Sequence, residues 1–220
     1  AIDFAALWKK QEGKLYGKVE TRVVTNKDAT VGNIFDAMDW LKNSATDRRD
    51  TALVLISGHG VFDSHGNWYL GSYELDTDHL SRTTISHAQF THWMDTALTA
   101  NAGLFVDTCH AGAARGRKSV HAVSPQGINL WQGSGTLLLA ACLPKETSLE
   151  DEAWGHGAFT RSILAAFEDR SSDLNSDGRL TFDELEVFVK AEVVRLTEGR
   201  QHPAANKPPT VSNVELAELR

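Results

Sequence analysis

The sequence predicts an α/β fold, a three-layer α/β/α sandwich in which helices cover both faces of a mostly parallel sheet. Three short apolar runs, at residues 52–56, 103–106 and 136–141, are bounded by turn-forming residues, as is typical of buried strands. Segments with apolar residues at helical spacing, at residues 30–45 and 87–99, precede the first two runs. This alternation favours right-handed βαβ units, so we expect the three strands to lie parallel in one sheet.

Composition narrows the class of protein. The chain has 220 residues, with 29 acidic against 22 basic side chains and a formal net charge of −7. This length suits one α/β domain, or a domain with a small appendage. Basic residues dominate no long stretch and no apolar run approaches the about 20 residues of a membrane helix, so neither nucleic acid nor a membrane is an expected partner. Two cysteines and the lack of a recognisable leader favour a reducing, cytoplasmic location.

Local patterns predict the remaining elements. Further helices are expected at residues 1–15, 159–167 and 182–197, and a further strand at residues 16–24. The glycine-flanked aromatic residues within 61–82 indicate a hairpin, and the polar residues 114–135 indicate an exposed, mobile loop. We expect one domain over residues 1–200 and an extended C-terminal tail over residues 201–220 that runs along the surface.

Two of the apolar runs lead into side chains that can carry out nucleophilic chemistry. His59 follows the first run, and Cys109 follows the second. Because the carboxyl ends of parallel strands meet at one edge of a sheet, we expect the two side chains to lie close together. A Cys109 thiolate would then attack a carbonyl, His59 would act as acid and base, and the N–H groups of Gly60 and Cys109 would hold the oxyanion. Either residue alone is more commonly an ordinary buried side chain, and the pairing favours the catalytic interpretation.

The same residues carry a family resemblance. SGHG at residues 57–60 and DTCHAG at 107–112 resemble the two signatures of the caspase-like cysteine peptidases, and are nearest to the metacaspase and bacterial caspase-like branch. Ala29-Thr30 before a helix, the run TLLLAACLPKETS and the run WGHGAFT resemble further landmarks of that family. The resemblance covers roughly residues 1–200 and implies a caspase-like fold and cysteine endopeptidase activity. The family's first strand, which normally precedes the helix at residues 1–12, is not found.

The resemblance also bears on specificity. DTCHAG replaces the QAC-x-G form of the animal caspases, which weakens the expectation of cleavage after aspartate. Asp107 lies two residues before Cys109, on the same face of a strand, and the resemblance to metacaspases implies that it lines a pocket for a basic P1 side chain. Alternatively, Asp107 caps the adjacent loop. Glu146 and Asp151, together with Glu150 and Glu152, form either an acidic wall of that pocket or a solvated face.

The predicted function is cleavage of proteins and peptides after Arg or Lys, with self-processing in the basic loop that contains Arg115, Arg117 and Lys118. Two alternatives stay open. The first is a catalytically silent caspase-like module that responds to calcium, and the second is a peptidase with an acidic P1 preference. A regulatory partner or a flanking domain is compatible with the sequence, which does not define an oligomeric state.

A second motif suggests a metal ion. Residues 173–184 fit the pattern D-x-[DN]-x-[DN]-G-x5-E of an EF-hand calcium loop without a gap. Calcium is the expected cofactor, with no organic cofactor, and its ligands would come from five residues: Asp173, Asn175, Asp177, the carbonyl of Arg179, and Glu184. The alternative is an Asx-turn followed by a capping box, with Thr181 as N-cap and Glu184 as its partner.

Overall fold

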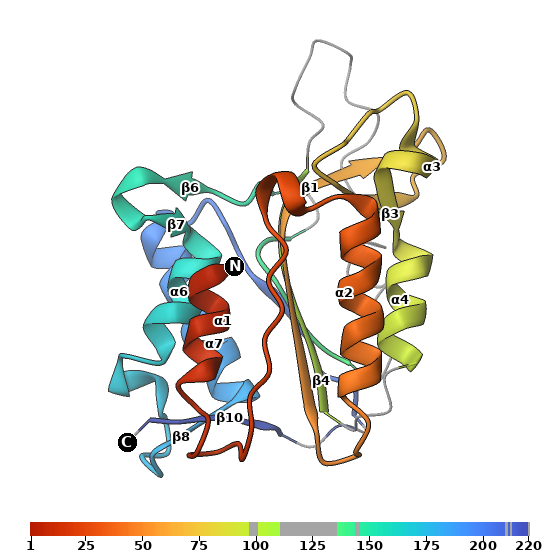
Figure 1. Cartoon of the computed structure of the whole chain (residues 1–220). Coiled ribbons are helices and arrows are strands. Elements are labelled where there is room, and N and C mark those ends of the chain that lie inside the picture. Colours follow the sequence, from red (N-terminus) through yellow and green to blue (C-terminus); the bar gives the residue numbers. More distant parts are fainter. Residues whose placement is uncertain (97–100, 111–135, 144–145, 210, 212, 220) are drawn as a thin grey trace.

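A central mixed sheet organises the chain. The computed structural model describes residues 1–96, 101–110, 136–143, 146–209, 211 and 213–219, with the backbone alone at Asp95, Cys109 and His110. In these residues a six-stranded sheet has the order β3-β2-β1-β4-β5-β9 (Figure 1). Its strands are β1 (Thr51–Phe62), β2 (Trp68–Gly71), β3 (Thr84–Ser86), β4 (Asn101–His110), β5 (Leu137–Ala140) and β9 (Ala204–Asn206).

The centre of the sheet is parallel and its flanks are antiparallel. The longest ladder joins β1 to β4 in parallel, from the pair Thr51 and Asn101 to the pair Gly60 and His110. β5 continues the parallel arrangement on the far side of β4. β2, β3 and β9 add antiparallel strands through shorter ladders. The predicted α/β/α sandwich with a mostly parallel sheet is therefore confirmed.

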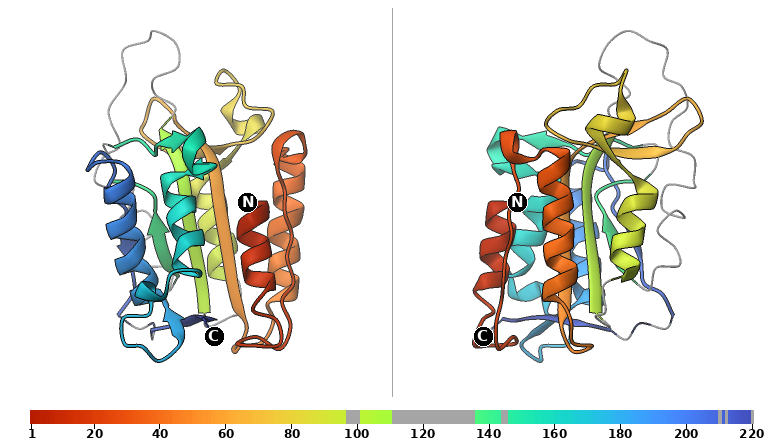
Figure 2. Two further views of the ribbon diagram at one scale, coloured as in Figure 1. Left: turned by 90° about the vertical axis from the view of Figure 1, so that its left-hand side faces the viewer. Right: turned by 45° about the vertical axis from the view of Figure 1, so that its right-hand side comes forward.

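Helices cover both faces of this sheet. One face carries α1 (Ile2–Lys9), α6 (Ala158–Ala166) and α7 (Phe182–Leu196), and the other carries α2 (Val31–Ser44) and α4 (His87–Thr96) (Figures 1 and 2). Adjacent residues of β4 point to opposite faces: Phe105 packs in the α1, α6 and α7 core, while Leu104 and Val106 pack in the α2 and α4 core. Two-sided burial explains why the central strands have continuous apolar sequences.

Short elements connect these layers. They are the helix α3 (Leu80–Thr83), the strands β6 (Glu150–Asp151), β7 (His156–Gly157), β8 (Arg179–Thr181) and β10 (Glu215–Glu218), and the 3-10 helices η1 (Asn26–Asp28), η2 (Glu152–Trp154) and η3 (Arg170–Ser172). Two helix starts follow the capping chemistry of the sequence, since Thr30 Oγ1 accepts from the Asn33 N–H at 3.2 Å and Ser86 Oγ accepts from the Gln89 N–H at 3.3 Å. Within the described residues, no helix has both the length and the apolar content needed to cross a membrane.

The structure differs from the sequence-based elements in the segment after α1 and at the end of the first buried strand. Residues 17–25 are extended but belong to no strand, so the strand predicted over residues 16–24 is wrong. The first buried strand does not end at residue 56, because its ladder with β4 continues to Gly60 and its hairpin with β2 continues to Phe62. The loop predicted at residues 114–135 lies outside the described residues.

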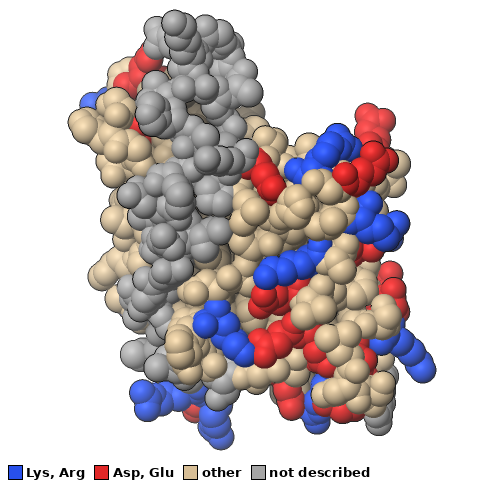
Figure 3. Space-filling model, turned by 180° about the vertical axis from the view of Figure 1, so that it is seen from behind, with Lys and Arg blue, Asp and Glu red and all other residues tan. Residues whose placement is uncertain are grey.

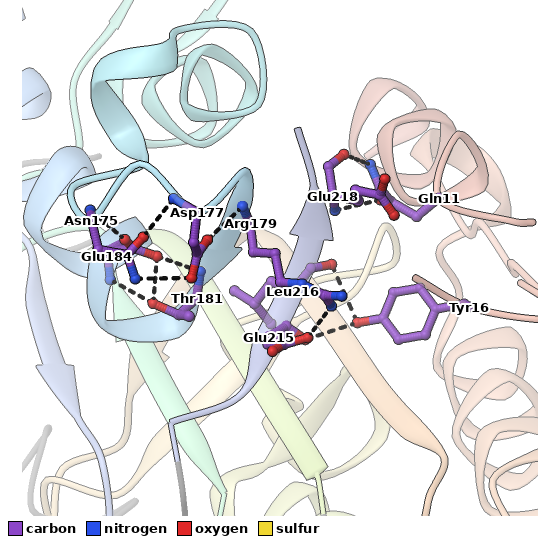
Figure 4. Close-up of polar contacts among 10 residues, drawn as sticks. All are labelled: Gln11, Tyr16, Asn175, Asp177, Arg179, Thr181, Glu184, Glu215, Leu216 and Glu218. Atoms are coloured by element: carbon purple, nitrogen blue, oxygen red, sulfur yellow. Dashed lines mark hydrogen bonds and ion pairs between the residues drawn. The ribbon is translucent and has the colours of Figure 1, made fainter. Parts of the chain in front are cut away.

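The C-terminal segment is built into the fold rather than laid over its surface. β9 pairs with β5 at one side of the sheet, and β10 pairs with β8. Tyr16 donates its hydroxyl to the Leu216 carbonyl at 3.3 Å, which ties the N-terminal turn to β10 (Figure 4). Burial raises the pKa of Tyr16 to about 12, so this hydroxyl stays protonated, and remains a donor, at neutral pH. Leu216 and Ala217 are fully buried as a result.

Candidate active site

The two predicted catalytic residues occupy matching positions on neighbouring strands. His59 in β1 and Cys109 in β4 are direct register partners in the parallel ladder. Neighbouring strands lie about 4.8 Å apart, so the two residues stand side by side near the carboxyl ends of their strands. His59 is solvent-exposed, as a residue that meets a substrate must be. It lies within the strand and not after it, which corrects the sequence-based boundary.

Gly60 occupies the next position and is enclosed by the sheet. It is buried and lies in register with His110 of β4 and Leu70 of β2. A side-chain carbon at Gly60 would lie 2.4 Å from Trp68 Nε1, so the indole packs directly over the glycine. The structure therefore gives this glycine a packing role. The assignment of its N–H to an oxyanion hole stays a prediction.

Asp107 is a buried carboxylate near the carboxyl end of β4. It is 8% exposed and in register with Ser57, two residues before Cys109. Its Oδ1 accepts from Ser148 Oγ at 2.6 Å, and its Oδ2 accepts from Thr160 Oγ1 at 2.7 Å. Among the described side chains, no lysine, arginine or histidine forms an ion pair with it. Within the described residues, both carboxylate oxygens of Asp107 are thus held by neutral hydroxyl donors.

The sequence alone predicted no role for the two residues that donate these hydroxyls. Ser148 closes the run TLLLAACLPKETS, and Thr160 closes the run WGHGAFT at the start of α6. Both are buried, at 4% and 5% exposure. A hydroxyl residue at the end of each run is the sequence signal that could have identified them. The sequence does not show that both runs fold against Asp107.

The other acidic residues proposed for the pocket have separate partners. Glu146 pairs with the His202 ring at 2.7 Å and accepts from the His202 N–H at 2.6 Å, which fastens the segment after β5 to the segment after α7. Asp151 accepts from the Ala153 N–H at 2.8 Å and caps η2. Glu150 lies nearer to Asp107: a side-chain carbon at Gly157 would lie 3.2 Å from Asp107 Oδ2 and 3.6 Å from Glu150 Cγ.

The calcium-like loop, residues 173–184, is satisfied by its own backbone (Figure 4). Asp173 accepts from the N–H groups of Asp177 and Gly178, at 3.1 and 2.7 Å. Glu184 accepts from the Leu174 N–H at 3.0 Å and from the Thr181 N–H at 2.9 Å, and Thr181 completes a capping box with it at the start of α7. Gly178 has a φ of +84°, as the turn requires.

These contacts match the turn and capping-box alternative. No group of three or more histidine, cysteine, aspartate or glutamate side chains is arranged to hold a metal ion within the described residues. Arg179 directs its side chain to an ion pair with Glu215, away from the loop. Asp173 and Glu184 each accept from backbone N–H groups in this arrangement, and a carboxylate oxygen that accepts one N–H keeps further lone pairs for a cation. Calcium binding stays a prediction.

The molecular surface in Figure 3 carries both signs of charge. On the described part of that face, Lys and Arg side chains alternate with Asp and Glu side chains over the lower right of the view. Ion pairs among the described residues include Arg195 with Glu192 and Lys207 with Asp183, each at 2.6 Å. Neighbouring charges of opposite sign thus partly neutralise one another at the surface.

Comparison with known proteins agrees with the fold. The family model of the caspase domain (Peptidase_C14) matches residues 9–213. The chain is similar in structure to protein GSU0716 from Geobacter sulfurreducens, with a TM-score of 0.63 and 15% sequence identity, over 100% of this chain and 88% of that one. At that identity the likeness concerns the fold alone. A search of curated protein sequences finds no match. The chain belongs to the caspase-domain family of cysteine peptidases.

Proposed function

We propose that this chain is a cysteine endopeptidase with a Cys109–His59 dyad. The observation that carries the proposal is the register pairing of the two residues at the carboxyl ends of β1 and β4. Two adjacent parallel strands support the thiol and the imidazole, so the sheet fixes the spacing of their backbones. A free thiol, with a pKa near 8.5, is only a few per cent ionised at neutral pH, and a neighbouring imidazole increases the thiolate fraction.

The reaction then proceeds in two halves. His59 takes the proton of the Cys109 thiol, the sulfur attacks the scissile carbonyl, and His59 donates that proton to the leaving amine as the peptide bond breaks. His59 next takes a proton from water, whose oxygen attacks the thioester carbon, and the Cys109 sulfur leaves as thiolate. The exposure of His59 is consistent with both steps, because the imidazole must reach substrate and water.

We assign the choice of substrate to Asp107 and propose that it selects Arg or Lys at P1. A carboxylate with no ion-pair partner among the described side chains binds an arginine fork or a lysine ammonium through charge-assisted hydrogen bonds. The two hydroxyls that hold Asp107 leave lone pairs on both carboxylate oxygens for these bonds. Glu150 Cγ and Asp107 Oδ2 both lie within 4 Å of a side-chain carbon placed at Gly157, so an acidic residue adjoins Asp107.

The test is a panel of fluorogenic peptides that differ only in P1, with Arg, Lys, citrulline and Asp, each assayed with calcium and with a chelator. The proposal predicts turnover of the Arg and Lys peptides, and loss of all turnover in Cys109→Ala and His59→Asn. Asp107→Asn should lower kcat/KM for Arg far more than for citrulline, because citrulline has the shape of Arg without its charge. Preference for Asp would contradict the P1 assignment, and turnover by Cys109→Ala would contradict the dyad.

Self-processing is a separate part of the proposal. Arg115, Arg117 and Lys118, which follow the nucleophile in sequence, lie outside the described residues. If the pocket selects basic residues, active protein should cleave itself after one of them, and the Cys109→Ala variant should stay intact. Intact-mass spectrometry of both proteins decides the matter, and identical masses would exclude self-processing.

A further inference from the structure

Gln201, which follows α7 in the chain, is a completely buried polar side chain. It is 0% exposed, although its segment belongs to no helix or strand. Its backbone N–H donates to Thr197 Oγ1 at 3.2 Å, and Thr197, directly after α7, is itself 0% exposed. A buried amide is unfavourable unless both its oxygen and its NH2 group are hydrogen-bonded. The contacts of this amide therefore indicate what the residue does.

The Gln201 amide bridges two segments of backbone. Its Nε2 donates to the Ala141 carbonyl at 2.8 Å, and its Oε1 accepts from the Leu149 N–H at 2.8 Å. The partners fix the orientation of the amide, because only the NH2 group can donate to a carbonyl and only the oxygen can accept from an N–H. Ala141 is anchored to the sheet by its own N–H, which donates to the Val106 carbonyl at 2.8 Å. Gln201 therefore fixes the position of Leu149 relative to β4.

Leu149 lies between the two hydroxyl groups that hold Asp107. The residue before it is Ser148, whose hydroxyl donates to Asp107 Oδ1. Its carbonyl accepts from the Ala158 N–H at 2.9 Å, at the start of α6. α6 also carries Thr160, whose hydroxyl donates to Asp107 Oδ2. Both donors thus reach the carboxylate from backbone that meets at Leu149.

These contacts close into a ring around Asp107. Val106, which anchors Ala141, directly precedes Asp107 in β4. From the carboxylate the ring passes through the hydroxyl donors to Leu149, and the Gln201 amide returns it to Ala141. Gln201 lies 52 positions from Leu149 and 60 from Ala141, so it joins the ring from a distant part of the chain. Removing the amide opens the ring and releases the backbone that carries the hydroxyl donors.

We propose that Gln201 is a positioning residue for the substrate pocket, because it sets the orientation of the Asp107 carboxylate without touching the substrate. The inference rests on the proposed function, in which Asp107 selects Arg or Lys at P1. A charge-assisted hydrogen bond to an arginine fork depends on the direction of the carboxylate oxygens, so a shift of their two donors weakens it. An apolar side chain of similar size would fill the same space without burying polar atoms, so packing alone does not explain an amide at this position.

The test compares Gln201→Met with a matched variant elsewhere in the chain. Methionine has a similar length but forms neither hydrogen bond. Gln11 is the control, because it is 4% exposed and also bridges backbone: its Nε2 donates to the Glu218 carbonyl at 3.3 Å, and its Oε1 accepts from the Glu218 N–H at 2.9 Å. Glu218 belongs to β10, at the opposite end of the molecule from β6, the strand that follows Leu149 (Figure 1).

The first readout is the ratio of kcat/KM for an Arg peptide to that for a citrulline peptide. Gln201→Met should lower this ratio about tenfold, since a misdirected carboxylate loses a charge-assisted hydrogen bond. Gln11→Met should keep the wild-type ratio, even if both variants lower Tm equally. An unchanged ratio in folded Gln201→Met, or an equal fall in Gln11→Met, would overturn the inference. A wild-type protein that prefers Asp peptides would instead contradict the proposed function.

Hydrogen exchange, followed residue by residue by NMR, supplies a second readout that needs no turnover. The amides of Leu149 and Ala158 should exchange faster in Gln201→Met than in wild type, because the first loses its acceptor and the second loses a fixed acceptor. Gln11→Met should accelerate exchange of the Glu218 amide and leave these two unchanged. If Ala158 exchanges at the wild-type rate in Gln201→Met, the ring does not connect Gln201 to α6 and the inference fails, whatever the peptide assay shows.

Gln201→Glu keeps the inference testable if Gln201→Met does not fold. When protonated, the carboxyl group of this variant can donate to the Ala141 carbonyl and accept from the Leu149 N–H, as the amide does, whereas the ionised group cannot donate. The Arg-to-citrulline ratio in Gln201→Glu should therefore match that of wild type at low pH and fall below it as pH rises. A ratio that differs from wild type by the same factor at every pH would overturn the inference.

Discussion

Thr160 Oγ1 donates a hydrogen bond of 2.7 Å to Asp107 Oδ2, although 53 positions separate the two residues. Ser148 supplies a second hydroxyl at 2.6 Å to the other oxygen. A buried carboxylate that is fixed through both oxygens has one orientation, and its remaining lone pairs point in defined directions. The structure therefore connects α6 and the segment before β6 to the residue that we assign to substrate choice.

The first prediction concerns these hydroxyls. Thr160→Val removes one charge-assisted hydrogen bond from Asp107 while keeping the side-chain shape, and should lower kcat/KM for an Arg peptide about tenfold. Thr160→Ser keeps the hydroxyl and should retain most of the activity. The diagnostic readout is the ratio of kcat/KM for Arg to that for citrulline, which falls only if the carboxylate is misplaced. If the Arg-to-citrulline ratio of kcat/KM is unchanged in Thr160→Val, Thr160 contributes only packing and does not position Asp107.

The second prediction separates the two glycines that flank His59. Gly60→Ala places a carbon 2.4 Å from Trp68 Nε1, so it should destabilise the fold by about 1–3 kcal/mol. Gly58→Ala has open space around the new carbon and should leave the free energy of unfolding nearly unchanged. Urea denaturation of both variants provides the comparison. Equal stability of the two would show that Trp68 moves aside without cost.

The third prediction concerns the start of α7. Thr181→Ala removes the hydroxyl that accepts from the Glu184 N–H and donates to its carboxylate, and should cost about 1 kcal/mol. For a chain of this size the expected fall in Tm is about 2–4 °C. Thr181→Ser keeps both hydrogen bonds and serves as the matched control. A Tm for Thr181→Ala equal to that of wild type would mean that the capping box contributes nothing.

The fourth prediction tests calcium at the loop that precedes this helix. We propose that calcium binds through Asp173 and Glu184 and raises Tm, and that Asp173→Ala abolishes the rise. A single loop of this kind is expected to bind weakly, with a dissociation constant of about 10⁻⁴–10⁻³ M. Magnesium at the same concentration is the ionic-strength control. If neither wild type nor variant responds to calcium, the loop is a turn with a capping box and nothing more.

The fifth prediction concerns pH. Burial lowers the pKa of His87 in the folded protein, below the value of about 6.5 for an unfolded chain. The unfolded state therefore binds more protons, and this histidine makes the free energy of unfolding fall as pH drops below about 6.5 through the lower folded pKa. His87→Gln should flatten that part of the pH profile. If the free energy of unfolding depends on pH in the same way in wild type and in His87→Gln, His87 is not the group responsible.

Much of the fold follows from local patterns in the sequence. Apolar runs locate β1, β4 and β5, and Thr30 and Ser86 mark the starts of α2 and α4, because these features depend on nearby residues. The failed strand at residues 16–24 has a physical reason: a strand exists only when its backbone pairs, and this segment faces a groove instead of a partner. A sequence pattern cannot report whether a partner is present.

The candidate site, like the fold, could be predicted from the sequence only in part. The positions of His59 and Cys109 at strand ends were predictable, since parallel strands end at a common edge. The roles of Ser148, Thr160 and His202 were not, because each depends on contacts between segments far apart in the chain. For the calcium motif, the structure shows backbone N–H donors on Asp173 and Glu184, and calcium binding stays a prediction.

The ladder between β1 and β4 has a consequence for how this chain tolerates change in length. Leu53 lies opposite Gly103 at one end of that ladder, and His59 lies opposite Cys109 near the other. A single inserted or deleted residue between positions 53 and 59 would move the His59 side chain to the other face of the sheet. Insertions between β1 and β2, by contrast, leave the ladder intact. Natural variants of this chain should therefore differ in length at residues 63–67 and keep the spacing within β1 constant.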